Sequence, residues 1–234
     1  MGRTVRRGRS GLRPGPDPVT VAVIIPTLDP ESEMCVAAVD AVTATALDVF
    51  VIVEHDRERA GFAETCNAGA ARTTADILVF LNDDTVVQTG WLEALTQPLS
   101  GPEGVAITGA ALFYPDGQIQ HSGVFLRRDP AGRLEAYNRR TPSPSGPVPA
   151  VTGACLAVRR DVWDDLGGFD ESYRTGYEDV DLCLRARQAG HEVRFVAESQ
   201  VVHLESKSPG RFDHAAENIA LLQERWGDLL KEVA

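Results

Sequence analysis

Long apolar runs, aromatic residues and paired cysteines are all scarce in this 234-residue chain. No run of about 18 or more apolar residues occurs, and no apolar segment follows the N-terminal arginines, so we expect neither a membrane span nor a secretory signal and predict a cytoplasmic protein. The four cysteines lie far apart without a CxxC pair, which argues against a zinc ribbon and a disulfide-stapled secreted fold. Aromatic residues make up only 6% of the chain, but the 43% hydrophobic content is enough for one large core.

Positive charge is also scarce, because the formal net charge is −11, and what there is lies unevenly. Residues 1–18 carry five arginines against Asp17, so the rest of the chain is more acidic than the whole. With its glycines and prolines, this stretch is predicted to be a disordered basic tail, either a solvated leader or an arm that touches anionic lipid or acceptor. The acidic body argues against nucleic acid as a partner.

Strand and helix patterns alternate in the first half of the chain. Strands are predicted at 19–26, 48–54 and 76–83, and helices at 30–46 and 61–74. This βαβαβ order predicts a parallel sheet with ligands beyond the carboxyl ends of its strands, where Glu54, His55, Asp83 and Asp84 fall.

The second half of the chain has a mixed pattern. A short helix is expected at 89–99, strands around the turn 115–117, an exposed mobile loop at 141–149, a strand at 150–160, helices at 161–169 and 177–190, and strands within 191–204. A final helix has an apolar stripe that should pack on the domain or on a partner, formed by Ile219, Leu222, Trp226 and Leu229.

Acidic residues at the tip of a buried strand are the most informative local feature. Asn82, Asp83 and Asp84 follow an apolar run, and unpaired charges are costly to bury there. Hard divalent cations bound to a diphosphate need only one or two protein carboxylates, because phosphates and water fill the other positions. The alternative is that these residues cap a helix beginning near Thr89 or sit in a solvated turn.

A second acidic cluster and a late histidine are further candidates. Glu178, Asp179 and Asp181 fall in the first turn of a predicted helix, where the helix dipole alone favours acids, but three are more than a cap needs. His203 follows an apolar strand, a position where histidine is more often structural, although a neutral imidazole can complete a metal site begun by a carboxylate.

Seven sequence blocks in order carry a family resemblance: VAVIIPT, GFAETCNAGAA, ILVFLNDDT, YPDGQIQHSG, VTGACLAVRRDVWDDLGGFDE, YEDVDLCLRARQAGHEV and VVHLESKS. Together they closely resemble the family 2 glycosyltransferases of GT-A fold, particularly the bacterial rhamnosyltransferase-like branch, over about residues 19–208. The resemblance implies an α/β, Rossmann-like, mixed and mainly parallel sheet flanked by helices in a single domain. Residues 19–115 would form the nucleotide-sugar half and 116–208 the acceptor half, followed by a C-terminal helix in 209–234.

The resemblance also implies a chemistry and a set of site residues. It implies inverting transfer from a UDP-, dTDP- or GDP-linked sugar with Mn²⁺ or Mg²⁺ held by Asp84 and His203. Asp179 matches the family's general base, which Glu178 and Asp181 would tune or position. The positions that match donor-binding residues are Pro26, Thr27, Glu54, Asn67, Gly69, Asn82 and Asp83, and those that match the passage of donor sugar or acceptor are Gly153 and Ala154.

Two of these assignments keep an alternative. Glu54 stands where the family has an Asp that usually holds the base or ribose, and the surrounding residues depart from the family pattern, so the nucleotide base is left undetermined. Gly69 is equally explained as a packing glycine in a helix.

Other function classes are weaker. A metal-dependent nucleotidyltransferase should have a Gly-rich phosphate loop with a nearby Lys or Arg after the first strand, and PTLDPESEM has neither. A catalytically inactive, nucleotide-sugar-binding relative is the other alternative, although every acidic position is present. The acceptor is left open among a glycan, a lipid-linked glycan, a natural product and a peptide, as are homodimer formation and peripheral membrane contact.

Overall fold

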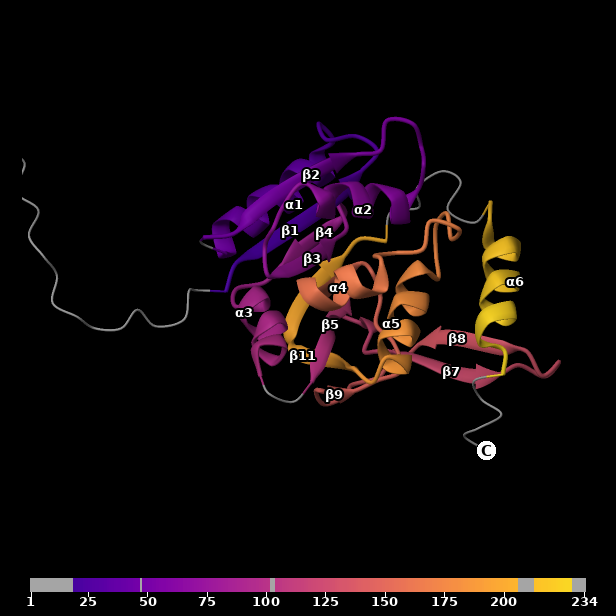
Figure 1. Cartoon of the computed structure of the whole chain (residues 1–234). Coiled ribbons are helices and arrows are strands. Elements are labelled where there is room, and N and C mark those ends of the chain that lie inside the picture. Colours follow the sequence, from indigo (N-terminus) through magenta and orange to yellow (C-terminus); the bar gives the residue numbers. More distant parts are fainter. Residues whose placement is uncertain (1–18, 47, 102–103, 206–212, 229–234) are drawn as a thin grey trace, which may run out of the picture.

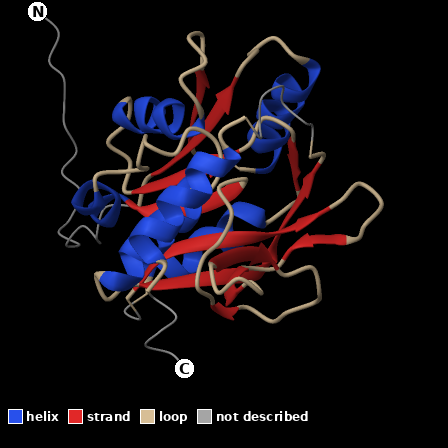
Figure 2. Cartoon of the chain, turned by 90° about the vertical axis from the view of Figure 1, so that its right-hand side faces the viewer, coloured by secondary structure: helices blue, strands red, loops and turns tan. Residues whose placement is uncertain are grey.

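The computed structural model describes residues 19–46, 48–101, 104–205 and 213–228. The predicted basic tail, 1–18, lies outside the described residues. Helices and strands are intermixed throughout the described body (Figure 2), as an α/β fold requires. No helix among the described residues is long and apolar enough to cross a membrane.

The first half of the chain forms the predicted parallel βαβαβ unit. Its elements are β1 (Val21–Thr27), α1 (Glu33–Thr45), β2 (Phe50–His55), α2 (Phe62–Ala71) and β3 (Ile77–Leu81). β1 lies between β2 and β3 and pairs with both in parallel. Ser32 starts α1 by accepting a hydrogen bond from the Cys35 amide at 3.2 Å.

The second half extends the same sheet with strands of both directions. The elements are β4 (Thr85–Val87), β5 (Val105–Phe113), β6 (Ile119–His121), β9 (Gly146–Pro147), β10 (Cys155–Arg159) and β11 (Glu192–His203). The strand order is β2-β1-β3-β10-β5-β11-β4, with β6 on β5 and β9 on β11. β10 runs antiparallel to both β3 and β5, whereas β11 runs parallel to β5. The predicted mixed α/β sheet is confirmed.

Helices cover both faces of this sheet because its strands are apolar on both sides. In β1, Val23 and Ile25 face a core shared with α1 and α3 (Trp91–Thr96), beside the 3₁₀ helix η1 (Gln97–Ser100). Ala22 and Ile24 face the other core. That core is shared with α2, α4 (Arg160–Leu166), α5 (Glu178–Gln188) and α6 (Ala215–Trp226).

A separate two-stranded sheet, β7 (Val124–Arg128) and β8 (Leu134–Asn138), extends from the main body with α6 beside it (Figure 1). Gln223 of α6 accepts a hydrogen bond from the Leu134 amide at 2.8 Å and donates to its carbonyl. The C-terminal helix therefore packs on the domain, one of the two alternatives expected from its apolar stripe.

The residues that form the buried stripe of α6 differ from the prediction. Ile219 is 37% exposed, Leu229 lies outside the described residues, and the buried positions are Asn218, Leu222 and Trp226. These three are spaced by four residues, so they share one side of the helix. Asn218 is tolerated there because its side-chain amide donates to the carbonyls of residues 175 and 176.

Three other local predictions were wrong in part. The loop 141–149 is not exposed throughout, because it contains β9 and because Val148 is buried. The late strands are one bulged strand, β11, whose register shifts between Val196 and Gln200. β4 and β8 were not predicted. β4 has three residues and pairs with β11, which is distant in sequence, and β8 is a short strand that pairs with β7 across the turn 129–133.

Candidate active site

The acidic strand tip lies where several strand ends meet. β3 ends at Leu81, which pairs with Cys155 at the start of antiparallel β10, and the Asn82 amide donates to the Ala154 carbonyl at 3.0 Å. On the other side, Thr85 of β4 pairs with His203 at the end of β11. The topology thus brings three separate sequence motifs to one edge of the sheet.

Asp84 does not cap a helix, which was the alternative explanation for the acidic tip. The chain continues from Asp84 directly into β4, and α3 begins only at Trp91, after a left-handed Gly90 with no side-chain cap. Asp84 is also 5% exposed, so it is not in a solvated turn.

Asp83 and Thr27 form one contact across β1 and β3. The Thr27 hydroxyl donates to Asp83 Oδ2 at 2.6 Å, and it accepts a hydrogen bond from the Asp29 amide at 3.1 Å. Burial raises the pKa of Asp83, an effect partly opposed by the Thr27 hydrogen bond. Two of the predicted donor-binding residues therefore lie together, while Pro26 is buried in β1 beside them.

Asp84 and His203 form the predicted pair. Asp84 Oδ1 lies 3.1 Å from His203 Nε2, and both residues are 5% exposed. Two donor atoms that are each about 2.1 Å from an octahedral cation, and at right angles to one another, lie about 3.0 Å apart. The carboxylate oxygen and the imidazole nitrogen thus have the chemistry and the separation that fit neighbouring ligands of Mg²⁺ or Mn²⁺.

This pair does not complete a coordination shell. No group of three or more His, Cys, Asp or Glu side chains that could hold a metal ion is found among the described residues. An ion held here by Asp84 and His203 needs ligands beyond these two side chains, and substrate phosphates and water commonly supply them to Mg²⁺.

Asp179, the second residue of α5, is bound to the segment that leads into β10. Its Oδ2 accepts from the Gly153 amide at 2.8 Å and its Oδ1 from the Val180 amide at 2.7 Å. Gly153 directly precedes Ala154, which contacts Asn82. Burial raises the pKa of the partly exposed Asp179 carboxyl, although these amide hydrogen bonds oppose the shift. The Gly153–Ala154 segment, just before β10, thus contacts both the base candidate and Asn82, two residues before the metal candidate Asp84.

Glu178 and Asp181 point elsewhere. Glu178 is 5% exposed and lies near Cys66 of α2. Burial raises the pKa of the Cys66 thiol, and the charge of Glu178 adds to this effect. Asp181 is fully buried and binds Arg185 Nε at 2.7 Å and Trp226 Nε1 at 2.9 Å. These contacts join α5 to α6. Among the described residues, the hydrogen-bond partners of Asp181 are therefore structural and do not include Asp179.

Three predicted donor-binding residues have structural contacts. Glu54 pairs with Arg72 at 2.7 Å across β2 and α2. The Asn67 amide donates to the Phe169 carbonyl at 2.9 Å and accepts from its main-chain amide at 3.0 Å. A Cβ atom on Gly69 would lie 2.5 Å from Ile24 Cγ2, which fits the packing role that was its alternative.

Gln120 contacts this site and His121 follows it in β6, and neither was predicted as a site residue. Gln120 Oε1 lies 2.7 Å from His203 Nδ1. His121 is buried, which lowers its pKa to about 4, and its ring contacts Asn138 Oδ1 at 2.9 Å and the Gly123 amide at 3.2 Å. The block YPDGQIQHSG contains both, but nothing in its pattern indicates that β6 turns Gln120 towards a strand about 80 residues later.

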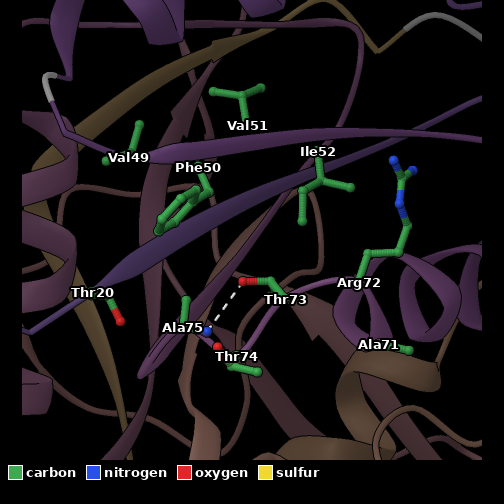
Figure 3. Close-up of a pocket in the computed structure, with 10 residues that line it drawn as sticks. All are labelled: Thr20, Val49, Phe50, Val51, Ile52, Ala71, Arg72, Thr73, Thr74 and Ala75. Atoms are coloured by element: carbon green, nitrogen blue, oxygen red, sulfur yellow. Dashed lines mark hydrogen bonds between the residues drawn. The ribbon is translucent and has the colours of Figure 1, made fainter.

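An open pocket of about 690 Å³ lies elsewhere (Figure 3). Its lining comes from Thr20, from residues 49–52 at the start of β2, and from residues 71–75 between α2 and β3. These segments lie at the amino ends of the strands, opposite the edge that holds Asp83 and Asp84. The pocket is therefore separate from the candidate active site.

Comparison with known proteins places the chain in a family. The family model described as Glycosyltransferase like family 2 matches residues 16–226. The chain belongs to this family. It is 34% identical over 161 residues to the O-antigen biosynthesis protein RfbC of Myxococcus xanthus, covering 61% of this chain and 12% of RfbC. It is 31% identical over 152 residues to an N-acetylglucosaminyl-diphospho-decaprenol L-rhamnosyltransferase of Mycobacterium tuberculosis, covering 58% and 49%.

A solved structure has the same fold. The crystal structure of GalNAc-T7 with UDP, GalNAc and Mn²⁺ superimposes with a TM-score of 0.68 at 18% identity, covering 91% of this chain and 49% of that one. The predicted GT-A fold and glycosyltransferase family are thus confirmed. The chain spans less than half the length of the curated relatives named here.

Proposed function

We propose that this family 2 member is an inverting glycosyltransferase that moves a sugar from a nucleotide-diphospho-sugar to an acceptor hydroxyl. The observation that carries the proposal is the buried Asp84–His203 pair, with its 3.1 Å separation. The Asp179 carboxylate is bound to the Gly153 amide, next to the Ala154 carbonyl that accepts from the Asn82 amide. A divalent cation held by Asp84 and His203, Mn²⁺ or Mg²⁺, would neutralise the charge that develops on the diphosphate leaving group.

The protein's own residues account for the other requirements. Asp83, oriented by the Thr27 hydroxyl, is available to bind the donor sugar or ribose. Asp179 takes the proton of the acceptor hydroxyl as that oxygen forms its bond to the anomeric carbon and the bond from that carbon to the diphosphate breaks. The Gly153 and Val180 amides hold the Asp179 carboxylate in one orientation before the acceptor arrives. Its raised pKa makes the carboxylate a stronger base than an exposed aspartate.

The relatives suggest which substrates to try first. One is named for rhamnosyl transfer to a diphospho-lipid-linked N-acetylglucosamine, and the structural neighbour was solved with UDP and Mn²⁺. We propose a bacterial-type glycan or lipid-linked glycan as the acceptor, and UDP, dTDP or GDP as the nucleotide of the donor.

The decisive experiment measures whether nucleotide binding depends on the metal and on Asp84. Thermal unfolding of the wild type is recorded with UDP, dTDP and GDP, with and without Mn²⁺. A nucleotide at about 100 times its Kd stabilises by about 2.7 kcal/mol, or roughly 5–10 °C for a domain of this size. We expect that rise for at least one nucleotide with Mn²⁺, and we expect Asp84→Asn to abolish it.

Asp165→Asn is the matched control, because Asp165 is an exposed aspartate on α4. It should keep the full Mn²⁺-dependent rise. If Asp84→Asn also keeps the rise, Asp84 is not a metal ligand, and if the wild type shows no rise with any of the three nucleotides, the proposed function is wrong.

A further inference from the structure

Gln120 is a buried polar residue whose amide faces His203 on both its oxygen and its nitrogen. Gln120 Oε1 lies 2.7 Å from His203 Nδ1, and Nε2 lies 3.5 Å from the main-chain oxygen of the same residue, at the outer edge of hydrogen bonding. The glutamine is 5% exposed and belongs to β6, which pairs with β5. Gln120, in the three-residue strand β6, thus contacts both the imidazole ring and the main-chain carbonyl of His203, a candidate metal ligand.

The orientation of this amide favours a proton on Nδ1 of His203 in the neutral ring. Turning the amide over would place its oxygen against the His203 carbonyl oxygen and its NH₂ group against Nδ1. The orientation present avoids that repulsion, so Oε1 accepts a hydrogen bond from Nδ1–H. The Nε2 atom then carries the lone pair.

A second contact on the other side of the ring agrees with this assignment. Asn82 Nδ2, a donor, lies 3.3 Å from His203 Nε2. A donor facing Nε2 and an acceptor facing Nδ1 both favour the tautomer with its proton on Nδ1, whereas the Asp84 Oδ1 acceptor, 3.1 Å from Nε2, favours a proton on Nε2 as long as no cation lies between them. A cation bound by Asp84 and His203 requires Nε2 to be unprotonated, and Gln120 then accepts a hydrogen bond from the proton that the ring keeps on Nδ1.

We propose that Gln120 is a positioning residue for the divalent cation: it holds the His203 ring with its Nε2 lone pair turned towards Asp84. The inference rests on the proposed function, since it requires Asp84 and His203 to be the cation's ligands. Histidines that bind metals usually donate their second ring N–H to an oxygen acceptor, and removing that acceptor typically lowers metal affinity about 10- to 100-fold.

The test compares variants that keep or remove the acceptor at Nδ1. Mn²⁺ affinity is measured by electron paramagnetic resonance of free Mn²⁺, with whichever of UDP, dTDP and GDP gives the largest Mn²⁺-dependent thermal shift in the wild type. Gln120→Met is close in length but cannot accept a strong hydrogen bond, and it should raise the Kd of Mn²⁺ about 10- to 100-fold. Gln120→Glu keeps an oxygen at Nδ1 and should stay within about threefold of the wild type.

Gln118→Met is the matched control at the same turn. Gln118 is exposed and its amide bonds to Asp116, so this variant should leave the Kd of Mn²⁺ unchanged. If Gln120→Met does not fold, Gln120→Asn replaces it, because the shorter side chain withdraws the amide from Nδ1. The ring nitrogens of His203 are also observed by ¹⁵N NMR with the same nucleotide and Mg²⁺, which is diamagnetic, and we expect the proton on Nδ1 in the wild type.

The outcomes separate the two proposals. A wild type that binds no Mn²⁺ with any of the nucleotides overturns the proposed function and this inference together. A wild type that binds Mn²⁺, with a Gln120→Met variant within about twofold of it, overturns this inference alone. Equal losses in Gln120→Met and Gln120→Glu, or a wild-type proton on Nε2, would also overturn it, since the acceptor at Nδ1 would then not be what matters.

Discussion

Replacing Asp181 with alanine should destabilise the fold strongly and leave nucleotide binding intact. The Asp181 carboxylate is fully buried and accepts from Arg185 Nε at 2.7 Å and from Trp226 Nε1 at 2.9 Å, with Arg225 Nη1 at 3.4 Å. It therefore joins the first half of α5 to the end of α6. Alanine would leave the Trp226 N–H without its acceptor and two guanidinium groups without this counter-charge.

The structure sets the size of the effect. Removing one partner of a buried, hydrogen-bonded ion pair costs about 3–5 kcal/mol, because the remaining charge stays desolvated. For a domain of roughly 150–250 residues each kcal/mol lowers the Tm by about 2–4 °C, so the expected fall is roughly 6–20 °C. Asp164 offers a matched control, because its pair with Arg160 is 3.5 Å long and its side chain is 60% exposed. Asp164→Ala should cost no more than about 1 kcal/mol.

Unfolding of both variants in urea, followed by circular dichroism, measures the free-energy change, and the Mn²⁺-dependent thermal shift with a nucleoside diphosphate measures binding. The resemblance to the family predicts a different result for Asp181, a supporting acid for catalysis. If Asp181→Ala keeps the wild-type free energy of unfolding but loses sugar transfer, the structural interpretation is refuted and the supporting role is restored.

Two further predictions concern Gly69 and Asp179. Gly69→Ala would place a methyl group 2.5 Å from Ile24 Cγ2 and should lower the free energy of unfolding by about 1–3 kcal/mol. The nucleotide affinity of the folded protein should change less than about twofold. Weakened nucleotide binding at unchanged stability would instead support the donor-binding role of Gly69. Asp179→Asn should keep the affinity for nucleotide and Mn²⁺ but lower transfer by about 10²–10⁴. Because burial raises the pKa of Asp179 and only the carboxylate accepts a proton, the acid limb of kcat/KM should lie above the ordinary aspartate pKa of about 3.9; a limb at or below that value would contradict the assignment.

Local patterns were sufficient to predict the βαβαβ unit in the first half of the chain. The apolar runs that became β1, β2 and β3 alternate with helical segments, and parallel strands place their carboxyl ends at one edge. Asp83 and Asp84 could therefore be assigned to that edge without knowing any contact. The pairing of Asp84 with His203, 119 residues later, needed the family resemblance as well, because a histidine after an apolar strand is more often structural.

The roles that could not be predicted depend on partners distant in sequence. Asn67 is bound to the main chain of Phe169, 102 residues later, and Gln120 is bound to His203, 83 residues later. A motif match places such residues near a site but does not say whether the side chain faces the ligand or the scaffold. The burial of Asn218 could not be predicted for the same reason. A polar side chain is tolerated on the buried side of α6 because it donates to two main-chain carbonyls, and these carbonyls belong to residues distant in sequence.

The contacts of Asn218 also bear on how the candidate base is placed. Tyr177, the residue directly before α5, has φ 75°, a left-handed conformation that is unfavourable for an aromatic side chain. Such a conformation persists only where surrounding contacts hold it, and Asn218 Nδ2 donates to the carbonyls of Thr175 at 2.9 Å and Gly176 at 3.0 Å, the two residues before Tyr177. Since α5 starts immediately after Tyr177, the contacts that hold this turn also help to set the direction in which the Asp179 side chain projects from the first turn of α5. The C-terminal helix therefore contributes to the geometry of the site although none of its side chains contacts Asp179 in the described structure.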